Sequence, residues 1–219
     1  MISYDVIRKD SAVNAYIAAA DSALAALGYT EHNIPHLTTV AERAADILKG
    51  LGYDGHTVEL ARIAGYLHDI GNVVNRVNHS QSGALIAFDI LNRYNMPPED
   101  IAEIISAIGN HDEGTGVPIS PIAAALIIAD KSDVRKSRVR NPDARSFDIH
   151  DRVNFSVMES ALALSRDRSE ITLVLAVDTA VSPIMDYFEI FLERMKLCRA
   201  AAIHLGIAFH LFMNGQQFA

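Results

Sequence analysis

The 219-residue sequence has a single cysteine, Cys198. A lone cysteine excludes an intrachain disulfide, which fits a protein of the reducing cytosol. No run reaches the roughly 18 apolar residues that a membrane-spanning helix needs. Residues 1–10 are mixed polar and lack the apolar core of a secretory signal. We therefore expect a cytoplasmic protein that has no membrane partner.

Basic residues are scarce, because 19 Lys and Arg face 27 Asp and Glu, for a net charge of −8. That balance argues against general nucleic-acid binding, which depends on neutralising phosphates with cations. Hydrophobic residues make up 50% of the chain, so a sizeable core can form and disorder is not expected. The length allows one large domain, or one domain with a smaller appendage.

The few basic residues are unevenly distributed. Only seven of them precede residue 131, and a local cluster follows. The cluster comprises Lys131, Arg135, Lys136, Arg138, Arg140 and Arg145. A basic cluster in an acidic protein suits a small anionic ligand, and a solvated helix end followed by a loop is the alternative interpretation.

Hydrophobic periodicity predicts helices in the first two thirds of the chain. The expected helices cover residues 6–27, 35–48, 57–69, 80–94, 98–109 and 121–136. Thr57, Ser80 and Ser120 stand where N-caps are expected. A polar loop over residues 141–148 then separates these helices from a segment of different character.

Apolar and β-branched residues at 153–164 and 170–177 flank a short polar turn, which predicts an antiparallel hairpin. Ser182-Pro183 predicts the start of a long helix over residues 184–204, and residues 207–213 are a candidate third strand. The expected fold class is therefore mainly α. A helical body over residues 1–140 carries a small α+β appendage over residues 141–219, packed on the body.

Two aspartates stand in apolar surroundings. Asp69 lies between Leu67 and Ile70, and Asp130 ends the apolar run at residues 122–129. Burying a carboxylate is costly unless a cation or hydrogen bonds compensate its charge. A metal ion would compensate both aspartates. For Asp69, a salt bridge or a helix-end hydrogen bond is the alternative.

Histidines flank the predicted helices in the same part of the chain. His68 precedes Asp69, but the His-Asp dipeptide is weak evidence because His111-Asp112 and His150-Asp151 also occur. The histidines that begin or follow predicted helices are His36, His68, His79 and His111, with His32 as a candidate cap or surface residue. Nitrogen and oxygen ligands of this kind suit Fe, Mn, Ni, Co or Zn.

The order of these residues resembles the HD superfamily of metal-dependent phosphohydrolases, a helical fold with a His…His-Asp…Asp pattern. The resemblance covers residues 35–133. It rests on His36, on His68-Asp69 in Leu-His-Asp-Ile-Gly, and on Asp130 in Ile-Ile-Ala-Asp-Lys. The combination is far more specific than any one of its parts.

The resemblance implies that His36, His68, Asp69 and Asp130 bind one divalent ion, of Fe, Mn, Ni, Co, Zn or Mg. His79 and His111 fall where two-metal branches of the family carry further ligands, so that Asp69 would bridge two ions. Asn72 replaces a lysine that is usual in the cyclic-dinucleotide branch, and a Gly-Tyr-Pro signature is missing. Cyclic dinucleotides are therefore not expected as substrates.

The function implied is hydrolysis of a phosphomonoester or phosphodiester, with a nucleotide among the candidate substrates, by metal-activated water. Lys131, Arg135 and Arg138 would neutralise phosphate charge. Lys131 is also a candidate catalytic residue, beside Asp69. Asp112 would orient water or hold the His111 ring, and a solvated loop residue is the alternative.

Two other functions stay open. Relatives of the same fold that hold two irons activate dioxygen, and the ligand types do not separate that di-iron oxygenase from a hydrolase. A non-catalytic HD-type nucleotide sensor would show the loss of a ligand, whereas every expected ligand type is present here. The appendage is expected either to form a homodimer contact or to close over a small phosphorylated substrate.

Overall fold

A computed structural model describes residues 2–219 of the chain. Its α-helices are α1 (Tyr4–Lys9), α2 (Ser11–Ala26), α3 (Ile34–Leu51), α4 (Gly55–Leu67), α5 (His79–Arg93), α6 (Pro98–Gly109), α7 (Pro121–Lys131), α8 (Ile149–Ser156) and α9 (Ile184–His204). Short 3-10 helices are η1 (Ile70–Val73), η2 (Lys136–Arg138) and η3 (Ala144–Ser146). The strands are β1 (Val157–Leu164), β2 (Glu170–Val177), β3 (Ala208–Met213) and β4 (Gln216–Gln217).

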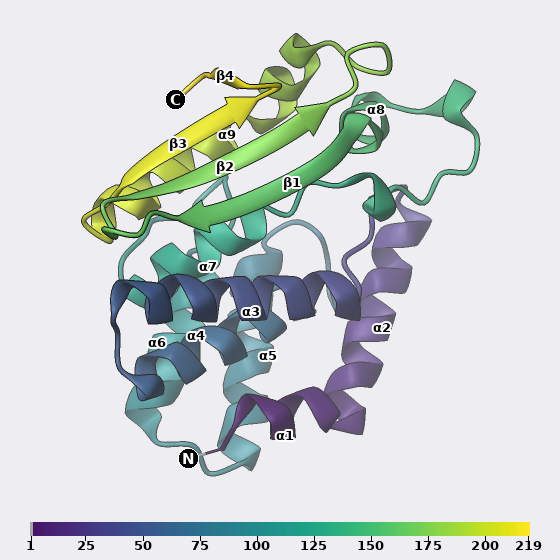
Figure 1. The fold of residues 1–219 in the computed structure, drawn as a ribbon. Coiled ribbons are helices and arrows are strands. Elements are labelled where there is room, and N and C mark those ends of the chain that lie inside the picture. Colours follow the sequence, from purple (N-terminus) through teal and green to yellow (C-terminus); the bar gives the residue numbers. More distant parts are fainter. Residues whose placement is uncertain (1) are drawn as a thin grey trace.

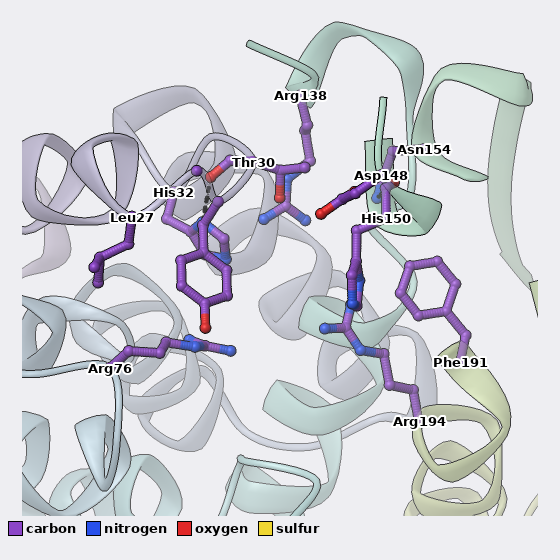
Figure 2. A pocket seen from close by; sticks show the side chains of 12 residues that line it. Leu27, Thr30, His32, Arg76, Arg138, Asp148, His150, Asn154, Phe191 and Arg194 are labelled. Carbon is purple, nitrogen blue, oxygen red and sulfur yellow. Dashed lines mark hydrogen bonds between the residues drawn. The ribbon is translucent and has the colours of Figure 1, made fainter. Parts of the chain in front are cut away.

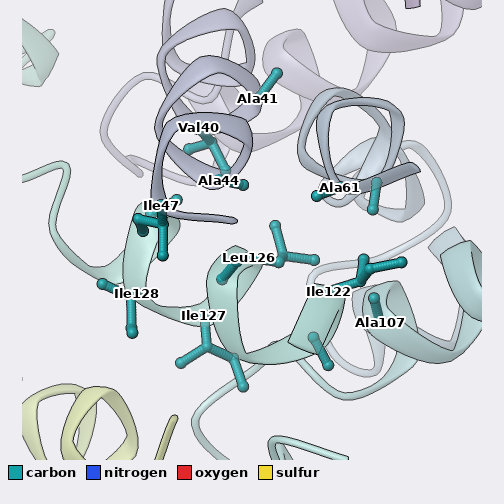
Figure 3. Close-up of a cluster of buried hydrophobic side chains, with 14 of the residues drawn as sticks. Val40, Ala41, Ala44, Ile47, Ala61, Ala107, Ile122, Leu126, Ile127 and Ile128 are labelled. Carbon is teal, nitrogen blue, oxygen red and sulfur yellow. The ribbon is translucent and has the colours of Figure 1, made fainter. Parts of the chain in front are cut away.

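Helix α7 forms the centre of the core. Every residue from Ile122 to Ala129 is at most 2% exposed, because α3, α4, α6 and α9 all pack against this helix. Figure 3 shows Leu126 of α7 facing small side chains of α3 and α4, including Ala44 and Ala61. Burying one Leu or Ile side chain stabilises a fold by roughly 1.5–3 kcal/mol. The helix therefore holds its last turn, which carries Asp130, in a fixed position.

A four-stranded sheet with the order β1-β2-β3-β4 lies across one end of the helical body (Figure 1). Strands β1 and β2 form the antiparallel hairpin that the sequence predicts. Strand β3 pairs with β2 in parallel, and α9 makes the connection between them. Helix α9 packs against β2 and β3 on one side and against α7 on the other.

The structure confirms the predicted fold class, a mainly α-helical body with a small α+β appendage that contains a hairpin and a long helix. The bounds of α6, β2 and α9 agree with the prediction at both ends. The division at residue 140 stays a prediction. Within residues 2–219, no helix combines the length and the apolar character that crossing a bilayer requires.

Two predicted helix starts are wrong. The helix expected over residues 6–27 is divided at Asp10, whose carboxylate accepts the backbone N–H groups of Ala12 and Val13 and so begins α2. Asp54, and not Thr57, caps α4 in the same way. An aspartate at an N-cap satisfies backbone donors that the helix itself leaves free, so it fixes where a helix begins.

Two further boundaries and one cap differ from the prediction. Helix α5 begins at His79, so Ser80 is inside it, and Ser182 makes no cap because Pro183 precedes α9 directly. Helix α7 ends at Lys131 instead of Lys136. Beyond this end, the Arg138 side chain donates to the Asp133 carbonyl, and residues 136–138 form the 3-10 helix η2 instead of continuing α7.

The first part of the predicted strand 153–164 is the end of α8. Asp148 caps this helix by accepting the backbone N–H of Asp151, and the helix continues to Ser156. Strand β1 therefore starts only at Val157. The β-branched residue Val153 gave a misleading signal, because burial against neighbouring elements outweighed its local preference.

Candidate metal centre

The end of one helix or the start of another positions each of the six predicted ligands. His36 lies in the first turn of α3, and His79 is the first residue of α5. His68 is the C-cap of α4, and Asp69 follows it before η1. Asp130 is in the last turn of α7, and His111 lies two residues beyond α6. Five helices therefore bring one ligand or a pair of ligands each to a common point.

A close helix contact allows these ends to meet. A Cβ atom on Gly65 of α4 would lie 2.7 Å from the Cα of Ala41 in α3. Only glycine tolerates such a close approach, so Gly65 sets the spacing of α3 and α4. Three residues after Gly65, the chain reaches His68, which faces His36 with ring centroids 5.4 Å apart.

Each ligand histidine uses its Nδ1 atom for a contact within the protein. The Nδ1 of His36 lies 2.7 Å from Asp133 Oδ2, and the Nδ1 of His68 lies 2.8 Å from the Gly65 carbonyl oxygen. A carbonyl oxygen only accepts, so His68 carries its proton on Nδ1. Nε2 of His68 is then the atom that a metal can bind once its proton has left, which is the arrangement found in metal-binding histidines.

The second pair of histidines is held in the same way. The Nδ1 of His79 lies 3.1 Å from the Arg76 carbonyl, and the Nδ1 of His111 lies 2.6 Å from the Ile108 carbonyl. Their Nε2 atoms are 3.2 Å apart. Holding the His111 ring was one of two candidate roles for Asp112, but the Ile108 carbonyl contacts that ring, and Asp112 Oδ1 lies 3.9 Å from the His79 Nε2. The structure places Asp112 at the margin of the cluster, with 26% of its side chain exposed.

Asp69 stands between the two pairs. Its Oδ2 lies 3.3 Å from the Nε2 of His68 and 3.8 Å from that of His36. Its Oδ1 lies 3.4 Å from the Nε2 of His79 and 3.8 Å from that of His111. Each carboxylate oxygen therefore faces one histidine pair, as a carboxylate that bridges two ions would.

Asp130 completes the first half of the cluster. Its Oδ1 lies 3.5 Å from the Nε2 of His36 and 3.6 Å from that of His68. Two groups in the described chain have the spacing that a metal ion needs, one formed by His36, His68 and Asp130, and one by His68, Asp69 and His111.

The residues present fit a divalent ion. The Nε2 atoms of His36 and His68 are buried, and neither has a hydrogen-bond partner within residues 2–219. A buried polar atom without a partner costs free energy, and ordinary proteins leave few of them. Imidazole nitrogens together with the oxygens of Asp69 and Asp130 form a donor set that suits a first-row transition metal.

The electrostatics of the cluster favour a cation. Burial on its own would raise the pKa of Asp69, but His68 and His111 lower it well below its usual range. For Asp130, Lys131 and His68 outweigh burial in the same direction. Burial would lower the pKa of His68, yet Asp69 and Asp130 outweigh it and raise that pKa to about 10. Both carboxylates are thus ionised and draw positive charge towards themselves.

Two residues outside the predicted set hold ligands in place. Asp133 is fully buried and binds His36, and burial, which would raise its pKa, is outweighed by His36 and Arg138, which lower it. The Nδ2 of Asn72 donates to Oδ1 of Asp69 at 3.1 Å and to its carbonyl at 2.9 Å. The sequence could have indicated Asp133 as a buried residue of the site, since it is a further carboxylate just after the apolar run that ends at Asp130.

The three predicted phosphate-binding residues have different positions. Lys131 is 5% exposed, and its Nζ lies 2.7 Å from Asp130 Oδ2. Arg138 is also buried and donates to the carbonyls of Glu31 and Asp133. Both side chains border the space next to the ligands. Arg135 instead pairs with Asp133 at 2.8 Å and lines neither that space nor the cavity beyond it.

A cavity of about 460 Å³ adjoins the cluster. Figure 2 shows the guanidinium groups of Arg76, Arg138 and Arg194 turned towards its interior, with His32 beside them. All four residues line both this cavity and the small space against the ligands, so the cavity opens onto the cluster. Arg76 and Arg194 come from segments that the sequence did not single out.

The outer wall of the cavity comes from the part of the chain that follows the helical body. Asp148, His150 and Asn154 contribute from α8 and the residue before it, and Phe191 contributes from α9 (Figure 2). No local sequence signal marks these residues. They become part of the site only because α8 and α9 fold back beside the ligands.

The sequence is similar to a known domain family and to other proteins. Residues 33–152 match the family model described as HD domain. An uncharacterized protein of Methanocaldococcus jannaschii is 31% identical over 171 residues, which are 67% of this chain. The chain spans 65% of the length of that relative. A predicted HD superfamily hydrolase from an uncultured Thermotogales bacterium has a TM-score of 0.43 and 24% identity, covering 60% of this chain and 73% of that one.

Proposed function

Because the chain belongs to the HD domain family, we propose that it is a divalent-metal-dependent phosphohydrolase that cleaves a small phosphate ester. One observation carries the proposal. Four histidines present their Nε2 atoms to two carboxylates at the point where a cavity lined by three arginines opens. A cation site next to a cationic cavity suits a substrate whose anionic group meets both.

The proposed metal ligands are His36, His68, Asp69, His79, His111 and Asp130. Divalent ions held by such residues lower the pKa of water and polarise a phosphoryl oxygen. Two of these side chains are held by neighbouring residues, since Asn72 hydrogen-bonds to Asp69 and Asp133 to His36. Substitution of residues that orient ligands in this way typically lowers metal affinity about 10–100-fold.

The arginines supply the binding of phosphate. Arg76 has no carboxylate within 4.0 Å in residues 2–219, so no anion neutralises its charge. Its Nη1 lies 3.4 Å from Asn72 Oδ1 and from His79 Nε2, and its guanidinium lies 5.6 Å from the centre of the Tyr29 ring. Arg138 is oriented by two backbone carbonyls and lies 3.9 Å from Asp133 Oδ2, a carboxylate that it shares with Arg135, Arg43 and His36. A planar guanidinium matches two phosphate oxygens at once, which favours a phosphate over a neutral ligand.

His32 offers a proton acceptor at the edge of the site. Its Nδ1 lies 2.7 Å from the Thr30 carbonyl, so the proton resides on Nδ1 and Nε2 carries a lone pair (Figure 2). Burial, followed by Arg138, lowers the pKa of His32 well below its usual value and keeps the ring neutral. We propose that Nε2 accepts a hydrogen bond from the substrate or from water.

Substitution of the shared ligands tests the function. His68→Ala and Asp69→Ala should each abolish Mn²⁺ binding and lower the hydrolysis of p-nitrophenyl phosphate and of a phosphodiester analogue to background. His204→Ala, which removes an exposed histidine at the end of α9, is the matched control and should leave both unchanged. Metal analysis of the purified protein accompanies the assays. Full activity in protein freed of metal would refute the proposal.

A further inference from the structure

A chain of charged side chains links the appendage to the candidate metal centre. The Nε of Arg194, on α9, donates to Glu113 Oε1 at 2.5 Å. The other oxygen of Glu113 lies 2.6 Å from the Nζ of Lys131. Lys131 in turn lies 2.7 Å from Asp130 Oδ2. The four residues come from α7, α9 and the loop after α6.

Glu113 has a specific electrostatic task in this chain. Lys131 is almost fully buried, and only 24% of the Arg194 side chain is exposed. Two cations held close together in a low dielectric repel each other strongly unless an anion lies between them. Glu113 gives one oxygen to each, so a single carboxylate holds the pair.

The pair keeps positive charge beside the ligands, because both Lys131 and Arg194 border the small space there and Arg194 also lines the cavity. The single negative charge of Glu113 neutralises only one of the two positive charges of Lys131 and Arg194. Asp130 is the second partner of Lys131, but it is also a proposed metal ligand, so its charge is shared with the metal. In residues 2–219, Arg194 contacts no other carboxylate within 4.0 Å. Within the described residues, its guanidinium hydrogen-bonds through Nε alone and lies over the Phe191 ring at 4.5 Å. Its terminal nitrogens therefore stay available where it borders both the cavity and the space beside the ligands (Figure 2).

We propose that Glu113 is a positioning residue that holds Lys131 and Arg194 as a phosphate-binding pair, and that α9 thereby forms part of the substrate site. The identity of the anion as substrate phosphate rests on the proposed function. The alternative is an ion pair that only fastens α9 to the helical body. The two differ in what the loss of Glu113 changes: phosphate affinity in the first case, stability alone in the second.

Isothermal titration of Mn²⁺-loaded protein with inorganic phosphate tests the proposal. Glu113→Gln and Arg194→Gln should each weaken phosphate binding about tenfold, because each removes or releases one charge-assisted contact. The double variant should be no weaker than the weaker single variant, since the two residues act as a unit. Arg199→Gln removes an exposed charge from the same helix and should bind phosphate like the unchanged protein.

Steady-state kinetics supply a second readout. Glu113→Gln should raise KM for p-nitrophenyl phosphate more than it lowers kcat, and Arg194→Lys should recover part of the affinity that Arg194→Gln loses. Unchanged phosphate affinity with a lowered melting temperature would overturn the proposal, as would additive effects in the double variant. Should Glu113→Gln fail to fold, the phosphate affinities of Arg194→Gln and Arg194→Lys decide between the two alternatives. Equal affinities in these two variants and the unchanged protein would overturn the proposal. If the unsubstituted protein hydrolysed no phosphate ester, the proposed function would be refuted. The titration would still show whether Lys131 and Arg194 bind phosphate as a pair.

Discussion

At the scale of single residues, the charge state of His68 connects the candidate metal centre to pH. Its Nδ1 proton is fixed by the Gly65 carbonyl, and Asp69 and Asp130 outweigh burial to raise its pKa to about 10. The metal-free protein therefore carries a proton on the Nε2 of His68 at neutral pH. A metal ion needs that same lone pair, so metal and proton compete for one atom.

Binding of Mn²⁺ to the metal-free protein at pH 7.5 should therefore release about one proton from His68. Isothermal titration in buffers of different ionisation enthalpy measures this number directly. Metal affinity should rise between pH 6 and pH 9 as the proton is lost more easily. An apparent enthalpy that is the same in all buffers would contradict the raised pKa.

The same shift has a consequence for stability. The pKa of His68 in the folded metal-free protein lies above its ordinary value of 6.5, so the protonated ring stabilises the fold fully below that value. The contribution is lost as pH rises towards 10. The melting temperature of the metal-free protein should fall over this range, and His68→Gln should remove this part of the pH dependence.

The residues of the candidate site differ in how far the sequence reveals them. Asp69 and Asp130 were predictable because a carboxylate in an apolar run demands a partner. Arg76 and Arg194 were not, because a basic residue in a loop or on an amphipathic helix is usually solvated. Only the tertiary structure turns their side chains to the same cavity. Whether the predicted residues bind metal stays a prediction that the substitutions above test.

At the scale of elements, the contact between α3 and α4 determines the distance between His36 and His68. Gly65 lets the two helices approach until a Cβ atom would overlap Ala41. Gly65→Ala should therefore force the helices apart and destabilise the fold by about 1–3 kcal/mol. It should also weaken Mn²⁺ binding, because one ligand lies at the end of each helix. Chemical unfolding and metal titration measure the two effects.

Gly55→Ala is the matched control for that substitution. Gly55 begins the same helix, and a Cβ atom there would meet nothing within 4 Å. Since alanine favours helix over glycine, this variant should be neutral or slightly more stable. Equal losses in the two variants would show that the α3–α4 contact is not what sets the ligand spacing.

The elements themselves were predictable where local signals agree. Helix α6 begins at Pro98 and α9 follows Pro183, and both signals are local, so their bounds agree with the prediction. The end of α7 was not, because the segment after it is held by a hydrogen bond from the Arg138 side chain to the Asp133 carbonyl, which no local pattern indicates. Residues 153–156, the end of α8, were predicted as strand because the eight residues of this helix are too few to show a helical period.

At the scale of the whole molecule, the helical body and the appendage share a site. Helix α9 packs against α7, and Arg194 reaches the cavity beside the ligands. The fold class was predictable from the change in residue pattern near residue 140. The shared cavity was not, because nothing in a one-dimensional pattern states how the second part folds back on the first.

Binding at the site should therefore stabilise α9 as well as the helical body. Hydrogen exchange followed by mass spectrometry should show added protection in α9, around Arg194, when Mn²⁺ and inorganic phosphate are present together. Strand β4, which lies at the far edge of the sheet, is the internal reference and should change little. Protection confined to α3, α4 and α7 would show that α9 does not respond to the ligand.

The parallel pairing of β2 with β3 bears on how the protein is made. Strand β3 lies between β2 and β4, and it is contributed by residues 208–213, after the whole of α9. During translation the helical body can fold first, since domains form as the chain emerges from the ribosome. The hairpin of β1 and β2 can form before α9, whereas β3 can join the sheet only after α9 has been made. A nascent chain therefore makes the residues of its histidine cluster before it gains the arginine that α9 supplies, so the cavity beside the cluster is completed only after α9 has been made.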